Sequence, residues 1–184
     1  MGREAGSADP RPVARLRKAT PADAAVLPEL EQSAGLSFRA DRELAWLADA
    51  GNLSPERYRE IIADGWSWIA EDERGRPVAF AAASREGLEL HLWELDVHIE
   101  YQRRGTGRRL LQRLIAEATA AGIPAMTLTT FRDVPWNAPF YRSMGFALIG
   151  PGELDPRLAG LLAKEASMGM PAERRCAMRR TLPT

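Results

Sequence analysis

The stretch Glu94-Leu-Asp-Val-His-Ile-Glu-Tyr-Gln-Arg-Arg-Gly-Thr-Gly-Arg-Arg-Leu-Leu111 passes from a strand pattern through a glycine loop into a helix pattern with no spacer. Residues 88–100 alternate apolar and polar side chains, which is typical of a β-strand. Behind Gly107 the apolar residues recur at helical spacing, at Leu110, Leu111, Leu114, Ile115 and Ala118. A helix that starts directly after the loop turns its free backbone N–H groups and the positive end of its dipole towards the loop. The stretch therefore predicts an anion site built from main chain, and a phosphate linkage suits it.

The residues of the loop itself strengthen this prediction. Gly105 and Gly107 let an anion approach the main chain without a Cβ in the way. Arg103, Arg104 and Arg108 add positive charge at the same end of the helix. A P-loop needs Gly-Lys followed by Ser or Thr, which this loop lacks, and a dinucleotide fingerprint needs a third glycine where this sequence has a leucine. Both of those phosphate motifs are therefore disfavoured.

Two segments carry a resemblance to a known family. Gln102-Arg-Arg-Gly-Thr-Gly107 resembles the acyl-CoA signature Gln/Arg-x-x-Gly-x-Gly/Ala of the GNAT superfamily of N-acetyltransferases, and Asn137-Ala-Pro-Phe-Tyr-Arg-Ser-Met-Gly-Phe146 resembles that family's Asn…Phe-Tyr-x-x-x-Gly-Phe block. Together they cover at most residues 78–150, and two motifs in the right order are more specific than one. The resemblance implies acetyl-CoA as co-substrate. The residues it implies as contacts of coenzyme A are Leu95, Asp96, Val97, Gln102, Arg103, Arg104, Gly105, Thr106, Gly107, Arg108, Asn137 and Phe140, the first three through their backbone.

Helix and strand patterns alternate along the chain, which predicts an α/β architecture with a mixed, mostly antiparallel sheet flanked by helices. The expected strands are residues 13–18, 66–71, 77–84, 88–100, 125–131, 146–149 and 175–182. The expected helices are residues 20–32, 39–50, 55–63, 107–122, 138–144 and 156–164. The resemblance implies the GNAT acyl-CoA N-acyltransferase fold, in which the strands holding Leu95 and Thr129 splay apart so that pantetheine lies between them. We expect residues 1–12 to form a flexible tail and residues 13–184 a single domain.

Acyl transfer from a thioester to an amine needs a proton acceptor for the amine and a proton donor for the departing thiolate. The resemblance implies that Tyr141 is the donor. Counting by twos places His91 on one face of its strand and Glu94 and Asp96 on the other. His91 is then the candidate base, since it matches the acceptor side of the family's strand, whereas a β-bulge would reverse the order and bring Glu94 inward. A base acting through ordered water is a third alternative.

Other residues near these motifs have two interpretations. Asn137 is expected to cap the short helix that follows it, and in the family this residue hydrogen-bonds pantetheine. Trp93 and Trp136 stand beside the expected chemistry and are candidates for the wall of the acceptor site. Phe38 and Trp46 lie in the segment that forms the family's variable acceptor lid.

Composition disfavours several classes of protein. The 25 Lys and Arg residues balance 25 Asp and Glu residues without a long basic run, so the charge pattern of a general nucleic-acid binder is missing. No apolar stretch approaches the roughly 18 residues that cross a membrane. With Cys176 as the sole cysteine and no signal-peptide pattern, we expect a cytoplasmic protein. His91 and His98 have no nearby cysteine, so no metal site is expected.

The resulting hypothesis is an acetyl-CoA-dependent N-acetyltransferase in which a primary amine attacks directly within a ternary complex. The expected acceptor is a small amine or an amino-acid-like molecule. One alternative keeps the fold and takes a protein N-terminus or a lysine side chain as acceptor. Another is a non-catalytic module that binds acyl-CoA as a sensor. The sequence also leaves a homodimer open.

Overall fold

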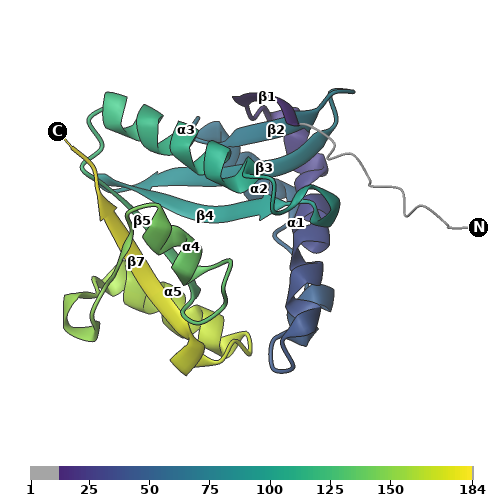
Figure 1. Ribbon diagram of the computed structural model, residues 1–184. Helices are drawn as coiled ribbons and strands as arrows, with labels where there is room; N and C mark the ends of the chain where they lie inside the picture. Colours follow the sequence, from purple (N-terminus) through teal and green to yellow (C-terminus); the bar gives the residue numbers. More distant parts are fainter. Residues whose placement is uncertain (1–12, 184) are drawn as a thin grey trace, which may run out of the picture.

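The computed structural model describes residues 13–183, and the tail expected at residues 1–12 lies outside the described residues. Seven strands form one sheet in the order β1-β2-β3-β4-β5-β7-β6 (Figure 1). The strands are β1 (Val13–Lys18), β2 (Trp68–Asp72), β3 (Pro77–Glu86), β4 (Glu89–Val97), β5 (Ala125–Phe131), β6 (Ala147–Leu148) and β7 (Arg175–Thr181). Neighbouring strands are antiparallel except β4 and β5, which are parallel. The mixed, mostly antiparallel sheet expected from the sequence is confirmed.

The two halves of the sheet separate between β4 and β5. These strands pair at only two positions, Leu90 with Met126 and His91 with Thr127. Figure 1 shows β4 and β5 leaving a common end in different directions. The other edge of β4 pairs with β3 from Glu89 to Val97. Beyond His91, the edge of β4 that faces β5 therefore has no strand partner in the described region.

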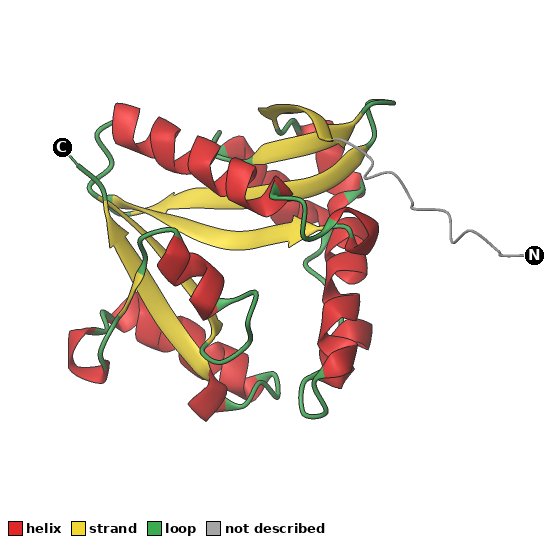
Figure 2. Cartoon of the chain, viewed as in Figure 1, coloured by secondary structure: helices red, strands yellow, loops and turns green. Residues whose placement is uncertain are grey.

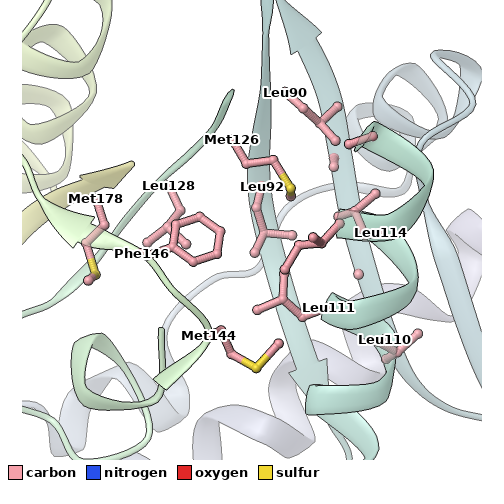
Figure 3. Close-up of a cluster of buried hydrophobic side chains, with 14 of the residues drawn as sticks. Leu90, Leu92, Leu110, Leu111, Leu114, Met126, Leu128, Met144, Phe146 and Met178 are labelled. Carbon is pink, nitrogen blue, oxygen red and sulfur yellow. The ribbon is translucent and has the colours of Figure 1, made fainter. Parts of the chain in front are cut away.

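Helices cover both faces of the sheet (Figure 2). On one face, α3 (Thr106–Ala120) buries its apolar stripe against β2, β3 and β4, and Figure 3 shows Leu110, Leu111 and Leu114 turned towards this core. Each of these leucines is fully buried. Since burial of a leucine side chain stabilises by roughly 1.5–3 kcal/mol, the stripe fixes the start of α3 firmly behind the loop.

The opposite face of the β2–β4 half is covered by α1 (Leu27–Gly35) and α2 (Pro55–Ala63). A second apolar cluster lies beneath them and includes Leu27, Leu30, Tyr58, Ile61 and Phe80. The other half of the sheet carries α4 (Ala138–Ser143) and α5 (Pro156–Ser167). Ser54 caps α2 by accepting a hydrogen bond from the backbone N–H of Arg57 at 3.2 Å.

The helix expected at residues 39–50 was wrong. In its place lie two 3-10 helices, η2 (Leu36–Ala40) and η3 (Ala45–Asp49). Between them the Asp41 carboxylate accepts from the backbone N–H groups of Glu43 and Leu44, at 3.1 and 3.2 Å. A short polar side chain that binds its own backbone in this way competes with a continuous helix.

Two further boundaries differ from expectation. The helix expected at residues 20–32 divides into η1 (Pro21–Ala25) and α1, because Pro28 has no N–H to continue a helix and stands in the first turn of a new one. The strand expected to run to residue 100 ends at Val97, and η4 (Ile99–Tyr101) follows it. His98 Nδ1 accepts from the backbone N–H of Glu100 at 3.3 Å, which starts that turn. The short helices η5 (Pro151–Glu153) and η6 (Ala172–Arg174) complete the chain.

Within residues 13–183, every helix is too short or too polar to cross a lipid bilayer.

Candidate active site

The loop between β4 and α3 has a backbone shape that suits an anion. Gly105 is the N-cap of α3 and has φ 77°, a left-handed conformation, and Arg103 has φ 59°. A Cβ added to Gly107 would lie 3.5 Å from Val97 Cγ2, so the helix start lies close against β4. Thr106 is buried, and its Oγ1 atom has no hydrogen-bond partner. An orphaned hydroxyl beside the free N–H groups of a helix start is what a phosphate ligand would satisfy.

Two side chains of the loop brace it against the rest of the chain. Gln102 Nε2 donates to the backbone oxygen of Val97 at 3.0 Å, and Gln102 Oε1 accepts from Ser37 Oγ at 3.0 Å. Arg108 Nη2 donates to Ser143 Oγ at 2.8 Å, which joins α3 to the end of α4. Sequence analysis expected Gln102 and Arg108 to contact coenzyme A. In the structure their side chains hold the loop in shape, while the backbone N–H of Arg108 belongs to the first turn of α3.

A β-bulge in β4 decides which side chains face the acceptor side. Across the β3–β4 pair, Ala83 lies opposite Leu92 and Ala82 lies opposite Glu94, so Trp93 is an extra residue on β4. Directly opposed residues share a face, and Ala82 belongs to the apolar cluster beneath α1 and α2. Glu94 therefore lies on that face.

The β-bulge changes the face that simple alternation along the strand assigns to Glu94 and Asp96. Asp96 lies opposite Phe80 and so joins Glu94 on the α1 and α2 face, where simple alternation had placed neither. Leu95 and Val97 pack on the opposite core, beneath α3. Of the alternatives weighed from the sequence, the structure contains the one with the bulge.

The carboxylates on this face lie in an environment that disfavours their charge. Glu94 and Asp96 are half-buried, and Asp96 Oδ2 is buried with no hydrogen-bond partner. From α1, Glu31 accepts from the Tyr58 hydroxyl at 2.6 Å and from the backbone N–H of Leu53 at 3.1 Å. Burial, and then the neighbouring carboxylates, hold the pKa values of Glu94 and Asp96 well above the ordinary range. A carboxylate with a raised pKa is a stronger proton acceptor than an exposed one.

His91 lies where β4 and β5 last pair. Its side chain is 1% exposed, and Nδ1 is 3.0 Å from Thr127 Oγ1 and 3.2 Å from Arg157 Nη1. Arginine can only donate, so Nδ1 is an acceptor and a neutral His91 carries its proton on Nε2. Burial and the Arg157 charge lower the pKa of His91 to about 3. An imidazole this weakly basic is poorly suited to take a proton from an amine, so the geometry favours Glu94 over His91 as the base.

Tyr141 lies on α4, in the half of the sheet that carries β5. Its ring packs edge-on against Phe140 and Phe146, with centroids 5.2 and 5.8 Å away. Burial, and then the charges of Asp96 and Glu94, raise the pKa of Tyr141 above its ordinary value. The phenol is therefore protonated at neutral pH and can donate a proton or a hydrogen bond, which is the property the sequence-based hypothesis requires of it.

Asn137 holds the N-cap position of α4, but its side chain makes no capping hydrogen bond. Its Oδ1 accepts instead from Thr130 Oγ1, at 2.7 Å. The expectation that the Asn137 side chain caps the helix was therefore wrong, because the hydroxyl of the neighbouring strand β5 engages that oxygen. Its expected contact with pantetheine stays a prediction.

A segment that we call the strap, residues 36–49, reaches from α1 towards the far end of β5. Phe38 packs edge-on against Phe131 with ring centroids 5.5 Å apart, and its ring lies 5.8 Å from that of Trp136. Arg174 ties the strap to β7: it donates to both oxygens of Asp41, at 2.5 and 3.1 Å. Of the four aromatic residues that sequence analysis placed near the acceptor, Phe38 and Trp136 thus meet at the end of β5, whereas Trp93 packs on the cluster beneath α1 and α2 and Trp46 lies beside Gly169.

Arg174 also pairs with two other carboxylates, Glu43 at 3.0 Å and Asp133 at 3.0 Å. The hydrogen bonds from Arg174 to Asp41, with those from the backbone N–H groups of Glu43 and Leu44, hold the pKa of Asp41 down, to about 2. In the described part of the chain, no cluster of His, Cys, Asp and Glu side chains has the arrangement of a metal site.

Comparison with known families identifies the fold. Residues 63–148 match the family model described as an acetyltransferase (GNAT) domain. This part of the chain belongs to the GNAT superfamily. Serotonin N-acetyltransferase 2, chloroplastic, from Oryza sativa subsp. japonica is 31% identical over 121 residues, which cover 63% of this chain and 59% of that protein. This GNAT chain therefore spans about three fifths of the length of that relative.

Two solved structures show the same fold as this GNAT protein. One is the PaiA N-acetyltransferase of Thermoplasma acidophilum in complex with coenzyme A, with a TM-score of 0.64, 16% identity and coverage of 91% of this chain and 98% of that one. The other is the ribosomal-protein-S18-alanine N-acetyltransferase of Escherichia coli, with a TM-score of 0.64, 18% identity and coverage of 92% and 94%. At these identities the likeness concerns the fold.

Sequence analysis of this GNAT chain missed Glu31, Tyr58 and Arg174. None belongs to a motif, and each reaches the site through contacts between distant parts of the chain. The only available signal was helical spacing in α1, which places Glu31 one residue after the buried Leu30. Spacing alone does not distinguish such a glutamate from a solvent-exposed one.

Proposed function

We propose that this protein is an acetyl-CoA-dependent N-acetyltransferase that acetylates a small primary amine by direct attack in a ternary complex. One observation carries the proposal: the gap between β4 and β5 has an anion loop at its mouth, a protonated phenol on one wall and carboxylates of raised pKa on the other. A donor thioester and an acceptor amine need those three features.

The residues of the chain fit coenzyme A as the donor. Bound acetyl-CoA supplies an activated acetyl carbonyl and a thiolate leaving group. The loop from Arg103 to Arg108 would hold its diphosphate through main-chain N–H groups and Thr106 Oγ1. The unpaired edge of β4 at Leu95, Asp96 and Val97 would orient the pantetheine arm through backbone hydrogen bonds.

In the proposed reaction the acceptor ammonium loses two protons, one to Glu94 and one to Tyr141. An ammonium acceptor gives one proton to Glu94, and its nitrogen then forms a bond to the acetyl carbon while the carbon–sulfur bond breaks. Tyr141 donates its proton to the departing sulfur and recovers one from the nitrogen as the amide forms. Glu94 passes its proton to water, so one proton is released per turnover. The role of Glu94 rests on the β-bulge, and that of Tyr141 on its place in the family block.

A small acceptor is favoured over a protein acceptor by the surroundings of the carboxylates. Glu94 and Asp96 are half-buried, and Arg174 ties the strap to β7 on the far side of the gap, so these carboxylates do not lie on an open surface. The name of the rice relative, a serotonin N-acetyltransferase, also supports a small amine. A protein N-terminus or a lysine side chain is the alternative acceptor.

The test follows release of free thiol from acetyl-CoA across a panel of small amines and short peptides, together with calorimetry of coenzyme A binding. The proposal expects coenzyme A to bind and at least one small amine to be turned over. Binding without turnover on any acceptor would favour a sensor module instead. Turnover restricted to peptides would move the acceptor to the protein class.

A further inference from the structure

Three carboxylates gather on the acceptor side of the gap, and we call Glu31, Glu94 and Asp96 the acidic pocket. Glu94 and Asp96 are two residues apart on one face of β4, so their Cα atoms lie roughly 6–7 Å apart. Glu31 reaches them from α1 through Tyr58, whose pKa is raised by burial and by the charges of Glu94, Glu31 and Asp96. The acidic pocket therefore spans two elements that pack against each other.

The acidic pocket lacks a compensating positive charge. Among residues 13–183, no ion pair involves any of its three carboxylates. Arg175, whose charge favours ionised Glu94, is itself paired with Glu165 at 2.8 Å. Buried or half-buried carboxylates without a cation are unfavourable in their charged form, so they take up protons more readily, and a cationic ligand would stabilise the charged form instead.

A second observation points to a ligand. Asp96 Oδ2 is buried and has no hydrogen-bond partner, although buried polar atoms in folded proteins are almost always paired. Glu31, in contrast, has two protein donors, from Tyr58 and Leu53. The oxygen that still lacks a hydrogen-bond donor therefore belongs to Asp96, two residues from the proposed base Glu94.

The chemistry of the reaction limits which cation can fill this role. An amine that attacks a thioester must first lose its proton, so the reacting nitrogen is neutral when it reacts. A monoamine would then leave Glu31 and Asp96 without a counter-charge. A second ammonium on the same molecule keeps its charge throughout and can pair with them. Trp93, packed on the apolar cluster beneath the pocket, offers a surface for the alkyl chain between the two nitrogens.

We propose that the acceptor is an alkyl diamine: one amino group reacts beside Glu94 while the second, still an ammonium, pairs with Glu31 and Asp96. This inference rests on the proposed function and names its substrate class.

The decisive comparison uses 1,4-diaminobutane and n-butylamine, which share a chain length and differ by one ammonium. We expect kcat/KM for the diamine to exceed that for the monoamine by about tenfold or more, after correction for its two reactive ends. Glu31→Gln should remove most of this preference, because it should raise KM for the diamine much more than KM for n-butylamine. Glu29→Gln is the matched control, because Glu29 is exposed on the same helix.

A binding measurement keeps the inference testable if turnover fails. Calorimetry of each amine into the protein saturated with coenzyme A should show tighter binding of the diamine, and Glu31→Gln but not Glu29→Gln should weaken it. Equal binding and turnover of the two amines, a better arylalkyl monoamine such as tryptamine, or equal effects of the two variants would overturn the diamine assignment. If coenzyme A does not bind at all, the proposed function fails instead.

Discussion

Two matched substitutions, Glu94→Gln and His91→Asn, separate the candidate bases. Glutamine keeps the size and polarity of Glu94 but cannot take up a proton. Asparagine at position 91 offers an oxygen that can accept from Arg157 and Thr127, as His91 Nδ1 does now. Each variant therefore removes a proton acceptor and preserves the local hydrogen bonds.

The pKa of each base sets the expected magnitude. An alkylammonium has a pKa of about 10, so moving its proton to an imidazole of pKa about 3 is uphill by about 10 kcal/mol. An exposed histidine of pKa about 6.5 would face about half of that cost. The burial of His91 and the Arg157 charge thus add about 5 kcal/mol and leave His91 ineffective as a base. The raised pKa of Glu94 lowers the free-energy cost of moving the proton from the alkylammonium to its carboxylate.

The assay is kcat/KM for thiol release as a function of pH, with the amine that turns over best. In the unmodified protein the rate should rise with pH as Glu94 ionises. Glu94→Gln should lower kcat/KM near neutral pH by about 10²- to 10⁴-fold, since a positioned base contributes about this much, and its rate should rise only as the amine itself loses its proton, towards about pH 10. His91→Asn should lower it less than about tenfold and keep the rise.

Melting temperatures and coenzyme A affinities of both variants must match the unmodified protein for the rates to be compared. If His91→Asn carries the large loss while Glu94→Gln stays within about tenfold, the reasoning from burial is refuted. If neither variant loses activity, a base acting through water replaces both.

Three other outcomes are expected. Tyr141→Phe should lower kcat by about 10²-fold or more with unchanged coenzyme A affinity, and an unaltered kcat in folded protein would remove its role as donor. Gly105→Ala should destabilise the folded protein by about 1–2 kcal/mol because φ is 77° there, and Gly107→Ala should stabilise it by up to about 1 kcal/mol because position 107 is helical. Thermal unfolding measures both variants, and equal shifts in melting temperature would contradict the loop geometry. The folded protein holds the pKa values of Glu94 and Asp96 above their unfolded values, so their contribution to stability is full below the ordinary carboxyl pKa and is lost as pH rises through the raised values. The double variant Glu94→Gln/Asp96→Asn should therefore lose less melting temperature between about pH 5 and pH 8 than the unmodified protein, and parallel curves would count against the raised pKa values.

Local sequence patterns predicted the parts of the fold whose structure depends on near neighbours. The glycines at 105 and 107 and the apolar spacing behind them fix the loop and α3, and both are present as expected. The strands next to α3 also followed from periodicity. The helix predicted at residues 39–50 is absent because the Asp41 carboxylate binds the backbone of the residues that follow it, and helix propensity does not report such a contact.

The composition of the site depended on contacts that local patterns do not contain. The extra residue Trp93 is defined only by the pairing of β4 with β3, so sequence analysis could name the bulge as an alternative but could not place it. Glu31 reaches the site through the packing of α1 on the sheet. Asn137 was expected to cap α4, yet a threonine on the neighbouring strand occupies its oxygen. In each instance the deciding partner is distant in sequence or on another strand.

The two-residue contact between β4 and β5 has a mechanical consequence. Each side of the sheet has its own hydrogen-bonded ladder, and only Leu90 with Met126 and His91 with Thr127 join them within the described chain. A ligand that binds along the open edge of β4 would take the place of a strand and contact both halves of the sheet. Ligand binding should then stabilise the contact between the two halves of the sheet. Amide hydrogen exchange on β4 and β5 should slow as the ligand concentration passes its Kd.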